Sequence, residues 1–299
     1  MSVKPTLAIT LGDPLGIGSE VVEKALNNSK LSQKAHWKIF GKSSSKMSAK
    51  KAGEVSWQAL EDAVTALRSG ECQALVTAPV SKTHLQLAGF PHPGQTEFLA
   101  HAFQTSRYAM MLAAPKLRVV LSTIHVPLRK IFKLLTPELI QEKIQITHES
   151  LKRDFGISKP RIGICGINPH AGENGLMGDD EEKILMPAIR LVRRKKIIVS
   201  DPLPPDTIFY QALQGKYDAV LCHYHDQGLI PLKTLFFDEG VNTTLGLPII
   251  RTSPDHGCAF DIAGKNLANP KSMRAAMELA IQMLRNRRYS PLLLCPRRG

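Results

Sequence analysis

Short apolar stretches alternate with amphipathic stretches along most of this 299-residue chain, and this alternation restricts the possible folds more than any other feature. The short apolar runs predict strands at 7–11, 74–77, 117–123, 161–167, 197–199 and 218–222. Between them, helical periodicity predicts helices at 57–67 with Ser56 as N-cap, from Thr136-Pro137 to Leu151, from Asp179 to Arg193, and around a late stripe of Met273, Met277, Ala280 and Leu284. Such an order favours an α/β fold with a largely parallel sheet.

Cysteine usage and hydropathy narrow the class further. The five cysteines have no CxxC spacing, so neither a disulfide framework nor a thiolate zinc site is expected. No uncharged apolar run reaches about 18 residues, so we expect no transmembrane helix and no membrane partner. A reducing, cytoplasmic location is the expectation that follows.

The net charge of +13 is a second constraint. Nucleic acid is one explanation, and anionic small substrates are another. The basic clusters at 42–51, 193–196 and 285–298 have no aromatic residues interleaved for base stacking. We therefore expect no nucleic-acid partner, and gel shifts at low ionic strength would test that expectation.

Three histidines lie where predicted strands end: His125, His170 and His225. Ligands of parallel sheets bind at the carboxyl ends of the strands, and three neutral imidazoles suit a divalent metal. Taken singly, each is more often an ordinary hydrogen-bonded loop histidine, and no HExxH spacing supports a metal site. His223 lies two residues before His225, so on a continuing strand both would share a face.

Other polar residues invite both functional and structural interpretations. The glycine-rich turn at 12–18 permits close backbone approach to an anion, but it lacks GxGxxG spacing and serves equally as a tight turn. Lys233 and Arg251 have the chemistry to hold a phosphate or carboxylate, near Asn242. Asp226 is a candidate proton carrier.

Eight motifs, in order, resemble one family. They are GDPLGIGSE at 12–20, TAPVSK at 77–82, PGQTEFLA at 93–100, IHVPLR at 124–129, NPHAGE at 168–173, YHDQG at 224–228, NTTLGLP at 242–248 and RTSPDHG at 251–257. The family is 4-hydroxythreonine-4-phosphate dehydrogenase, of pyridoxal phosphate and pyridoxine biosynthesis. The resemblance extends from about residue 5 to residue 280.

The resemblance implies a two-domain fold like that of isocitrate and isopropylmalate dehydrogenases, with the active site in the interdomain cleft. It implies a first, discontinuous domain at 1–100 and 240–299, and a second at 101–239 that carries the contacts of a homodimer. The implied reaction is oxidation of 4-phosphooxy-L-threonine at C3 by NAD or NADP, followed by decarboxylation to 3-amino-2-oxopropyl phosphate. The oxidoreductase would use one divalent metal: zinc, magnesium or cobalt.

The resemblance also assigns residues. It implies that His125, His170 and His225 hold the metal, which is shared between subunits. The substrate, a small phosphorylated hydroxy acid, would be bound by Gln95, Thr96, Lys233, Asn242 and Arg251, and the catalytic residues would be Lys233 and Asp226.

One departure from the family leaves alternatives open. Gln95 stands where the motif usually has histidine, and an amide neither carries positive charge nor acts as an acid at neutral pH. A related dehydrogenase acting on a phosphorylated sugar acid, such as threonate 4-phosphate, is therefore the alternative. A catalytically weakened relative that only binds ligands is another.

Overall fold

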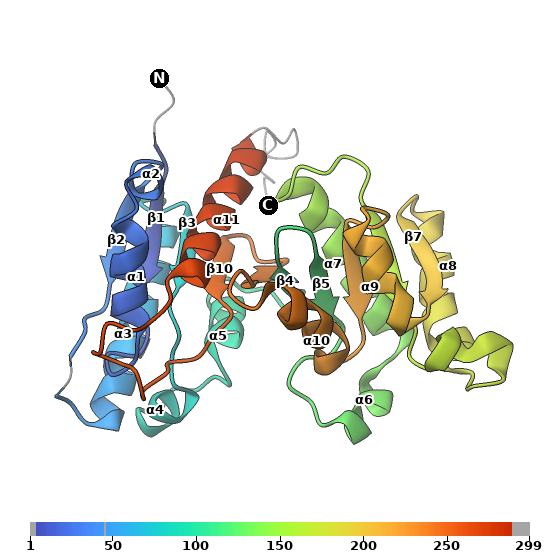
Figure 1. Cartoon of the computed structure of the whole chain (residues 1–299), viewed down its shortest axis with the longest axis horizontal. Coiled ribbons are helices and arrows are strands. Elements are labelled where there is room, and N and C mark those ends of the chain that lie inside the picture. Colours follow the sequence, from blue (N-terminus) through green and yellow to red (C-terminus); the bar gives the residue numbers. More distant parts are fainter. Residues whose placement is uncertain (1–3, 45, 289–299) are drawn as a thin grey trace. The chain divides into compact units, whose positions relative to one another are not determined.

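The structure is a computed structural model that describes residues 4–44 and 46–288. The chain divides into two compact units, Met1–Ser106 with Asp238–Arg285 and Arg107–Phe237 with Asn286–Gly299. Figure 1 labels their helices and strands. A search of the described helices finds none with the length and apolar character needed to cross a membrane.

The first unit is built on strands in the order β2-β1-β3-β10-β9. The neighbouring pairs are parallel except that β9 runs antiparallel to β10. Almost every residue of β1 and β3 is buried, as is typical of parallel strands that are covered on both faces. Its elements are β1 (Thr6–Thr10), α1 (Gly18–Leu26), α2 (Ser29–Ser32), β2 (His36–Phe40), α3 (Ala49–Arg68), β3 (Ala74–Thr77), α4 (Lys82–Leu87), α5 (Gln95–Ala102), β9 (Val241–Leu245), β10 (Ile250–Pro254) and α11 (Lys271–Arg288).

Helix α3 corrects one sequence prediction. The helix begins at Ala49, and Ser48 is its N-cap, with Oγ accepting a hydrogen bond from the Lys51 N–H. Ser56, predicted as the cap, lies inside the helix and is 1% exposed. Its hydroxyl donates to the carbonyls of Ala52 and Gly12, so this serine joins α3 to the turn after β1.

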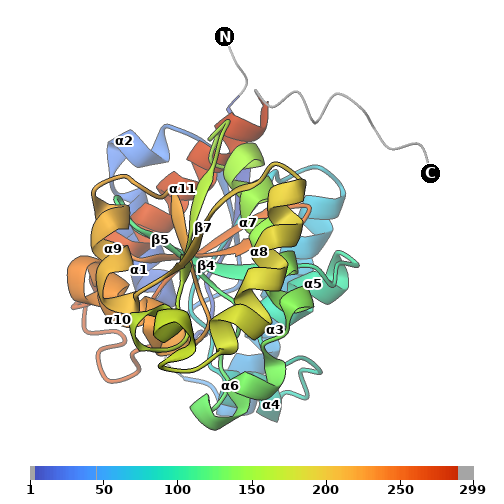
Figure 2. The same cartoon turned by 90° about the vertical axis from the view of Figure 1, so that its right-hand side faces the viewer.

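The second unit has strands in the order β4-β5-β8-β6-β7, all parallel except that β4 runs antiparallel to β5. Figure 2 shows α9 and α10 on one face of these strands and α7 and α8 on the other. The elements are β4 (Ala109–Ala113), β5 (Arg118–Leu121), α6 (Leu128–Leu134), α7 (Pro137–Arg153), β6 (Arg161–Cys165), the 3₁₀ segment η1 (Pro169–Gly175), the π-helical turn η2 (Glu181–Leu185), α8 (Met186–Arg194), β7 (Ile198–Leu203), α9 (Pro205–Leu213), β8 (Ala219–Cys222) and α10 (His225–Phe236).

The structure confirms two of the local predictions made from the sequence, one helix start and one buried helix face. Thr136 caps α7, its Oγ1 accepting from the Leu139 N–H at 3.2 Å, and Pro137 occupies the first helical position. The stripe of Met273, Met277 and Ala280 is fully buried, as expected for core residues.

The parallel trio β5, β8 and β6 positions the candidate metal ligands. β8 lies between β5 and β6, so the carboxyl ends of all three strands, at Leu121, Cys222 and Cys165, share one edge. The segments that leave this edge carry His125, His225 and His170 respectively.

Candidate functional site

Two of the three candidate ligands meet in the second unit. The rings of His125 and His225 have centroids 5.5 Å apart. His225 is the first residue of α10, and its Nδ1 lies 2.7 Å from Oδ1 of Asp226. Because a carboxylate accepts hydrogen bonds, this contact favours the tautomer with its proton on Nδ1, in which Nε2 can bind a metal. A carboxylate on the far nitrogen is the usual support of a metal-binding imidazole, so this pair fits a divalent metal.

His170 is exposed on the segment after β6, and the structure does not bring it to this pair. Within residues 4–44 and 46–288, no group of three or more histidine, cysteine, aspartate or glutamate side chains is arranged to hold a metal ion. A single chain therefore presents two imidazoles together and a third apart from them.

His223 does not share the face of His225, contrary to the expectation from strand periodicity. β8 ends at Cys222, so the alternation of a strand stops before either histidine. His223 is fully buried, with Nε2 2.6 Å from the Cys165 carbonyl oxygen and Nδ1 3.4 Å from Ser122 Oγ. Burial lowers the pKa of His223 to about 4, so it is neutral and structural at physiological pH.

A buried cation dominates the candidate substrate residues of the first unit. Arg251, on β10, is 5% exposed. Its Nη2 donates to Thr77 Oγ1 at 2.8 Å and lies 3.4 Å from Gln95 Oε1, and its Nη1 lies 3.5 Å from Thr244 Oγ1. Burial lowers the pKa of Arg251 to about 10, although the charge of Glu97 partly offsets this effect.

These partners are neutral oxygens, which do not compensate a buried charge as a carboxylate would. The arrangement can therefore bind an anion. Sequence reasoning missed Thr77 and Thr244 as supports of Arg251, although both lie in quoted motifs. No local sequence signal could have paired them, because Thr77 is 174 positions from Arg251 in the chain and only the fold brings the two together.

The remaining candidates have distinct surroundings. Gln95 begins α5, and its Nε2 lies 3.3 Å from the Ala78 carbonyl oxygen. Asn242, on β9, has a buried Oδ1 with no hydrogen-bond partner among the described residues. Thr96 is half-buried in the first turn of α5. Lys233, near the end of α10 in the second unit, has its Nζ 5.9 Å from the ring centroid of Phe237.

The glycine-rich turn after β1 serves packing. A Cβ at Gly12, where φ is +70°, would lie 2.1 Å from the Pro79 carbonyl oxygen. The N–H groups that an anion would need are engaged: Leu15 N–H donates to Asp13 Oδ1, and Ile17 N–H donates to the Cys258 carbonyl. The tight-turn interpretation therefore holds over the anion-binding one.

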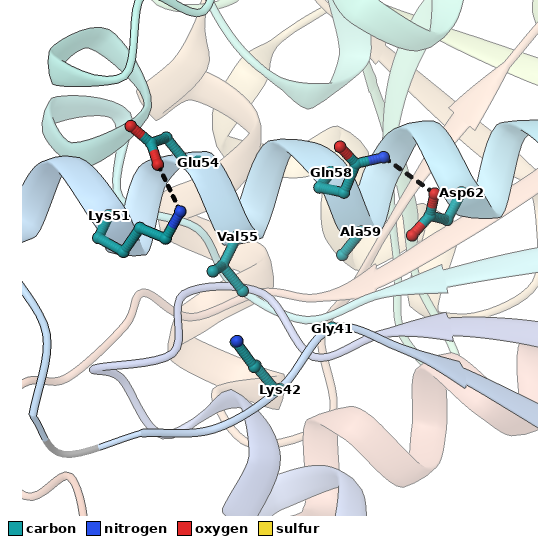
Figure 3. A pocket seen from close by; sticks show the side chains of 8 residues that line it. All are labelled: Gly41, Lys42, Lys51, Glu54, Val55, Gln58, Ala59 and Asp62. Carbon is teal, nitrogen blue, oxygen red and sulfur yellow. Dashed lines mark hydrogen bonds and ion pairs between the residues drawn. The ribbon is translucent and has the colours of Figure 1, made fainter.

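A surface pocket of about 450 Å³ opens beside α3, lined by Gly41, Lys42, Lys51, Glu54, Val55, Gln58, Ala59 and Asp62. Its polar groups pair with one another: Lys51 with Glu54 at 2.8 Å, and Gln58 with Asp62 at 3.0 Å (Figure 3). None of the candidate residues lines it.

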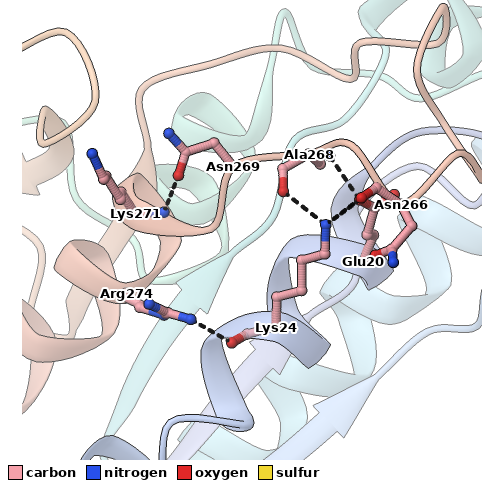
Figure 4. A network of polar contacts seen from close by, with 7 residues as sticks. All are labelled: Glu20, Lys24, Asn266, Ala268, Asn269, Lys271 and Arg274. Atoms are coloured by element: carbon pink, nitrogen blue, oxygen red, sulfur yellow. Dashed lines mark hydrogen bonds and ion pairs between the residues drawn. The ribbon is translucent and has the colours of Figure 1, made fainter.

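A polar network anchors the segment between β10 and α11 to α1 (Figure 4). Lys24 Nζ donates to Glu20 Oε1 and to the carbonyls of Asn266 and Ala268, and Glu20 Oε1 accepts from the Ala268 N–H. Arg274 donates to the Lys24 carbonyl at 3.0 Å, which ties α11 to α1.

The α/β architecture of the chain is shared with solved structures of other proteins. A β-decarboxylating dehydrogenase from Thermococcus kodakarensis has this fold, with a TM-score of 0.57 at 19% identity, covering 93% of this chain and 83% of that one. The prediction of an isocitrate/isopropylmalate dehydrogenase-like fold is confirmed.

Within this class the family is specific. The family model described as "Pyridoxal phosphate biosynthetic protein PdxA" matches residues 17–280, and the chain belongs to that family. A 4-hydroxythreonine-4-phosphate dehydrogenase from Zymomonas mobilis is 43% identical over 326 residues, covering 95% of this chain and 97% of its own. A protein from Oceanobacillus iheyensis with a provisional description as a D-threonate 4-phosphate dehydrogenase is 39% identical, covering 95% and 99%.

Among solved structures, a 4-hydroxythreonine-4-phosphate dehydrogenase from Klebsiella pneumoniae has a TM-score of 0.84 at 36% identity. The match covers 94% of this chain and 98% of that one. The resemblance found in the sequence motifs is thus confirmed across nearly the whole chain.

Proposed function

We propose that this chain oxidises the C3 hydroxyl of 4-phosphooxy-L-threonine with NAD or NADP and then releases carbon dioxide to give 3-amino-2-oxopropyl phosphate, in pyridoxal phosphate biosynthesis. The relatives' names support the reaction. The structural observation that carries the proposal is the buried guanidinium of Arg251, which only an anionic ligand would fully compensate.

The chain's own residues hold the substrate in this proposal. Arg251 and Lys233 bind its anionic groups, and Gln95 and Thr96 supply hydrogen bonds. The unpartnered Oδ1 of Asn242 accepts a hydrogen bond from a substrate N–H or O–H, which would relieve the cost of burying that oxygen.

The oxidation removes a hydride from C3 of the substrate and a proton from the C3 hydroxyl. When bound, the divalent metal would polarise the C3 hydroxyl, and the nicotinamide would accept the hydride. Lys233 and Asp226 are the proposed proton carriers: one takes the hydroxyl proton, and one returns a proton to the carbon from which carbon dioxide leaves. Asp226 also fixes the proton of His225 on Nδ1.

The metal would be zinc, magnesium or cobalt, held by His125, His170 and His225 from two copies of the chain. One copy presents His125 and His225 together, and a second copy would supply His170. Large apolar side chains exposed in the second unit suit a homodimer interface: Leu128 at 64%, Leu176 at 84% and Ile230 at 63%. Buried free thiols at Cys72, Cys165, Cys222 and Cys258 suit a cytoplasmic location.

A phosphorylated sugar acid such as D-threonate 4-phosphate is the second candidate substrate. Gln95 beside Arg251 motivates it, because an amide stands where the family motif usually has histidine and can neither carry a positive charge nor act as an acid at neutral pH. The description of the relative from Oceanobacillus iheyensis also supports this second substrate.

The test is the appearance of NADH or NADPH absorbance with each substrate, before and after chelator treatment. Turnover of 4-phosphooxy-L-threonine that stops with chelator and returns with Zn²⁺, Mg²⁺ or Co²⁺ is expected. Turnover of D-threonate 4-phosphate alone would transfer the proposal to the second substrate. A metal-loaded protein inactive on both would contradict the dehydrogenase proposal.

A further inference from the structure

The segment that carries His170 has an unusual backbone. Every residue from His170 to Asn174 has a positive φ, between 41° and 79°, and only Gly172 among them is a glycine. Non-glycine residues pay a steric cost in this left-handed region, and a run of them persists only where the surroundings impose it. Something outside the segment must therefore hold it in place.

Glu181 is the side chain that holds the start of this segment. It is 4% exposed. Its Oε1 accepts hydrogen bonds from the N–H groups of Ile167 at 2.8 Å and Asn168 at 2.7 Å. Its Oε2 accepts from Nδ2 of Asn168 at 3.0 Å. One carboxylate thus orients three donors immediately before Pro169 and His170.

The packing around this carboxylate is close. A Cβ at Gly172 would lie 2.7 Å from Glu181 Oε2, and one at Gly178 would lie 2.7 Å from Asn168 Nδ2. Glu181 begins a single π-helical turn, Glu181–Leu185, ahead of α8. Such turns insert one residue into a helix and are frequent at functional sites. The left-handed segment is therefore folded around the carboxylate of Glu181.

The strand side of the segment is held as firmly. Gln227 of α10 donates from Nε2 to the Gly166 carbonyl and accepts from the His223 N–H, each at 2.7 Å. The Gly166 N–H donates to the Leu203 carbonyl at 2.7 Å. These bonds fix residues up to 166. Glu181 extends this order through the N–H groups of residues 167 and 168, and Asp180 adds a hydrogen bond from Asn168 Nδ2 at 2.9 Å.

We propose that Glu181 is a positioning residue that presets the His170 imidazole for metal binding before any metal arrives. The inference rests on the proposed function, in which His170 is a metal ligand. A ligand held in advance loses little freedom on binding, so loss of Glu181 weakens metal affinity rather than the chemical step.

The experiment compares Zn²⁺ affinity, by calorimetry on chelator-treated full-length protein, in Glu181→Ala, His170→Ala and the matched control Glu182→Ala. Glu182 is the adjacent residue, 62% exposed, and its carboxylate lies 3.6 Å from Arg190. We expect Glu181→Ala to weaken Zn²⁺ binding about 10- to 100-fold. Glu182→Ala should leave it unchanged. Glu181→Gln, which keeps one oxygen for the two backbone N–H groups, should be intermediate and serves if the alanine variant does not fold.

Two further readouts separate positioning from general stability. Hydrogen exchange of amides 167–174 in the metal-free protein should accelerate in Glu181→Ala, with exchange in the β-strands unchanged. Saturating Zn²⁺ should restore most of kcat. Wild-type Zn²⁺ affinity in Glu181→Ala together with weak binding in His170→Ala would overturn this inference alone. Wild-type affinity in His170→Ala would overturn the metal assignment on which it rests.

Discussion

Replacing Arg251 with methionine should make the protein more stable and inactive at once. In the folded chain the guanidinium is 5% exposed, and burial lowers its pKa well below the ordinary arginine value, to about 10. That difference corresponds to about 3 kcal/mol of destabilisation of the charged form on folding. The cost is fully present below about pH 10 and is relieved only as the pH rises above that value.

The methionine variant removes this cost but also loses hydrogen bonds. The hydrogen bonds from Arg251 to Thr77, Gln95 and Thr244 go to uncharged oxygens, and several are long. Together they stabilise the folded state by about 1 to 2 kcal/mol. The net expectation for Arg251→Met is a gain of about 1 to 2 kcal/mol in the free energy of unfolding, within the range measured for apolar replacement of buried charges.

The assay follows from the chain itself. Both tryptophans, Trp37 and Trp57, lie in the first unit with Arg251, so tryptophan fluorescence during urea unfolding reports on that unit. The control is Lys51→Met, because Lys51 is a cation 60% exposed on α3 in the same unit. Substrate turnover is measured in parallel and should be lost only in Arg251→Met.

A decrease of more than about 1 kcal/mol in the free energy of unfolding of the first unit in Arg251→Met would refute the reasoning. The guanidinium would then be a structural group whose hydrogen bonds to its neighbours outweigh the cost of its burial. Retention of the wild-type KM for the phosphorylated substrate would refute it equally, since an anion would not depend on Arg251.

Three other substitutions test the remaining assignments. His170→Ala should abolish metal binding and activity while circular dichroism and the melting temperature stay unchanged; full activity would exclude His170 as a ligand. Asp154→Asn should cost about 3 to 5 kcal/mol in urea unfolding, because Asp154 is 1% exposed between Arg153 and Arg287, whereas Asp201→Asn at a 65% exposed site should cost little. Burial alone would raise the pKa of Asp154, but the two arginines outweigh burial and lower the pKa. The stabilisation that Asp154 provides is therefore present above about pH 4 and is lost as the pH falls below that value. The asparagine variant should lack this acid dependence. Gln95→His should raise kcat/KM for 4-phosphooxy-L-threonine relative to D-threonate 4-phosphate if Gln95 selects the substrate, and an unchanged ratio would show that it does not.

Local sequence signals predicted the parts of the fold that local physics decides. The strand at 74–77 and the Thr136 cap of α7 were predicted at their observed bounds, because a buried apolar run and an N-cap hydroxyl each act over a few residues. β2, β4, β9 and β10 were not predicted. Strands such as β9, with sequence VNTTL, depend on their neighbours for pairing, and their composition alone gives no clear signal.

The errors have tertiary causes. Ser56 has the chemistry of a cap, but α3 begins seven residues earlier with Ser48 as its cap, and Ser56 instead bonds the Gly12 carbonyl across the fold. His223 and His225 were expected to share a face, and the position at which β8 ends decided otherwise. The negative charge at 179–182 suggested only a favourable helix start, whereas Glu181 folds inward and receives three hydrogen bonds.

The proposed anion-binding and metal-binding residues are held by different kinds of interaction. Arg251 of the first unit is a cation whose burial is unfavourable until an anion arrives. In our proposal, the imidazoles of the second unit are oriented in advance, His225 by Asp226 and His170 by Glu181. In our proposal, Arg251 therefore acts in anion recognition and Glu181 in metal binding, through separate interactions. A double variant of Arg251 and Glu181 should show additive losses in substrate and Zn²⁺ affinity when each is measured without the other ligand. Strong non-additivity under those conditions would mean that the two units communicate before substrate and metal are both bound.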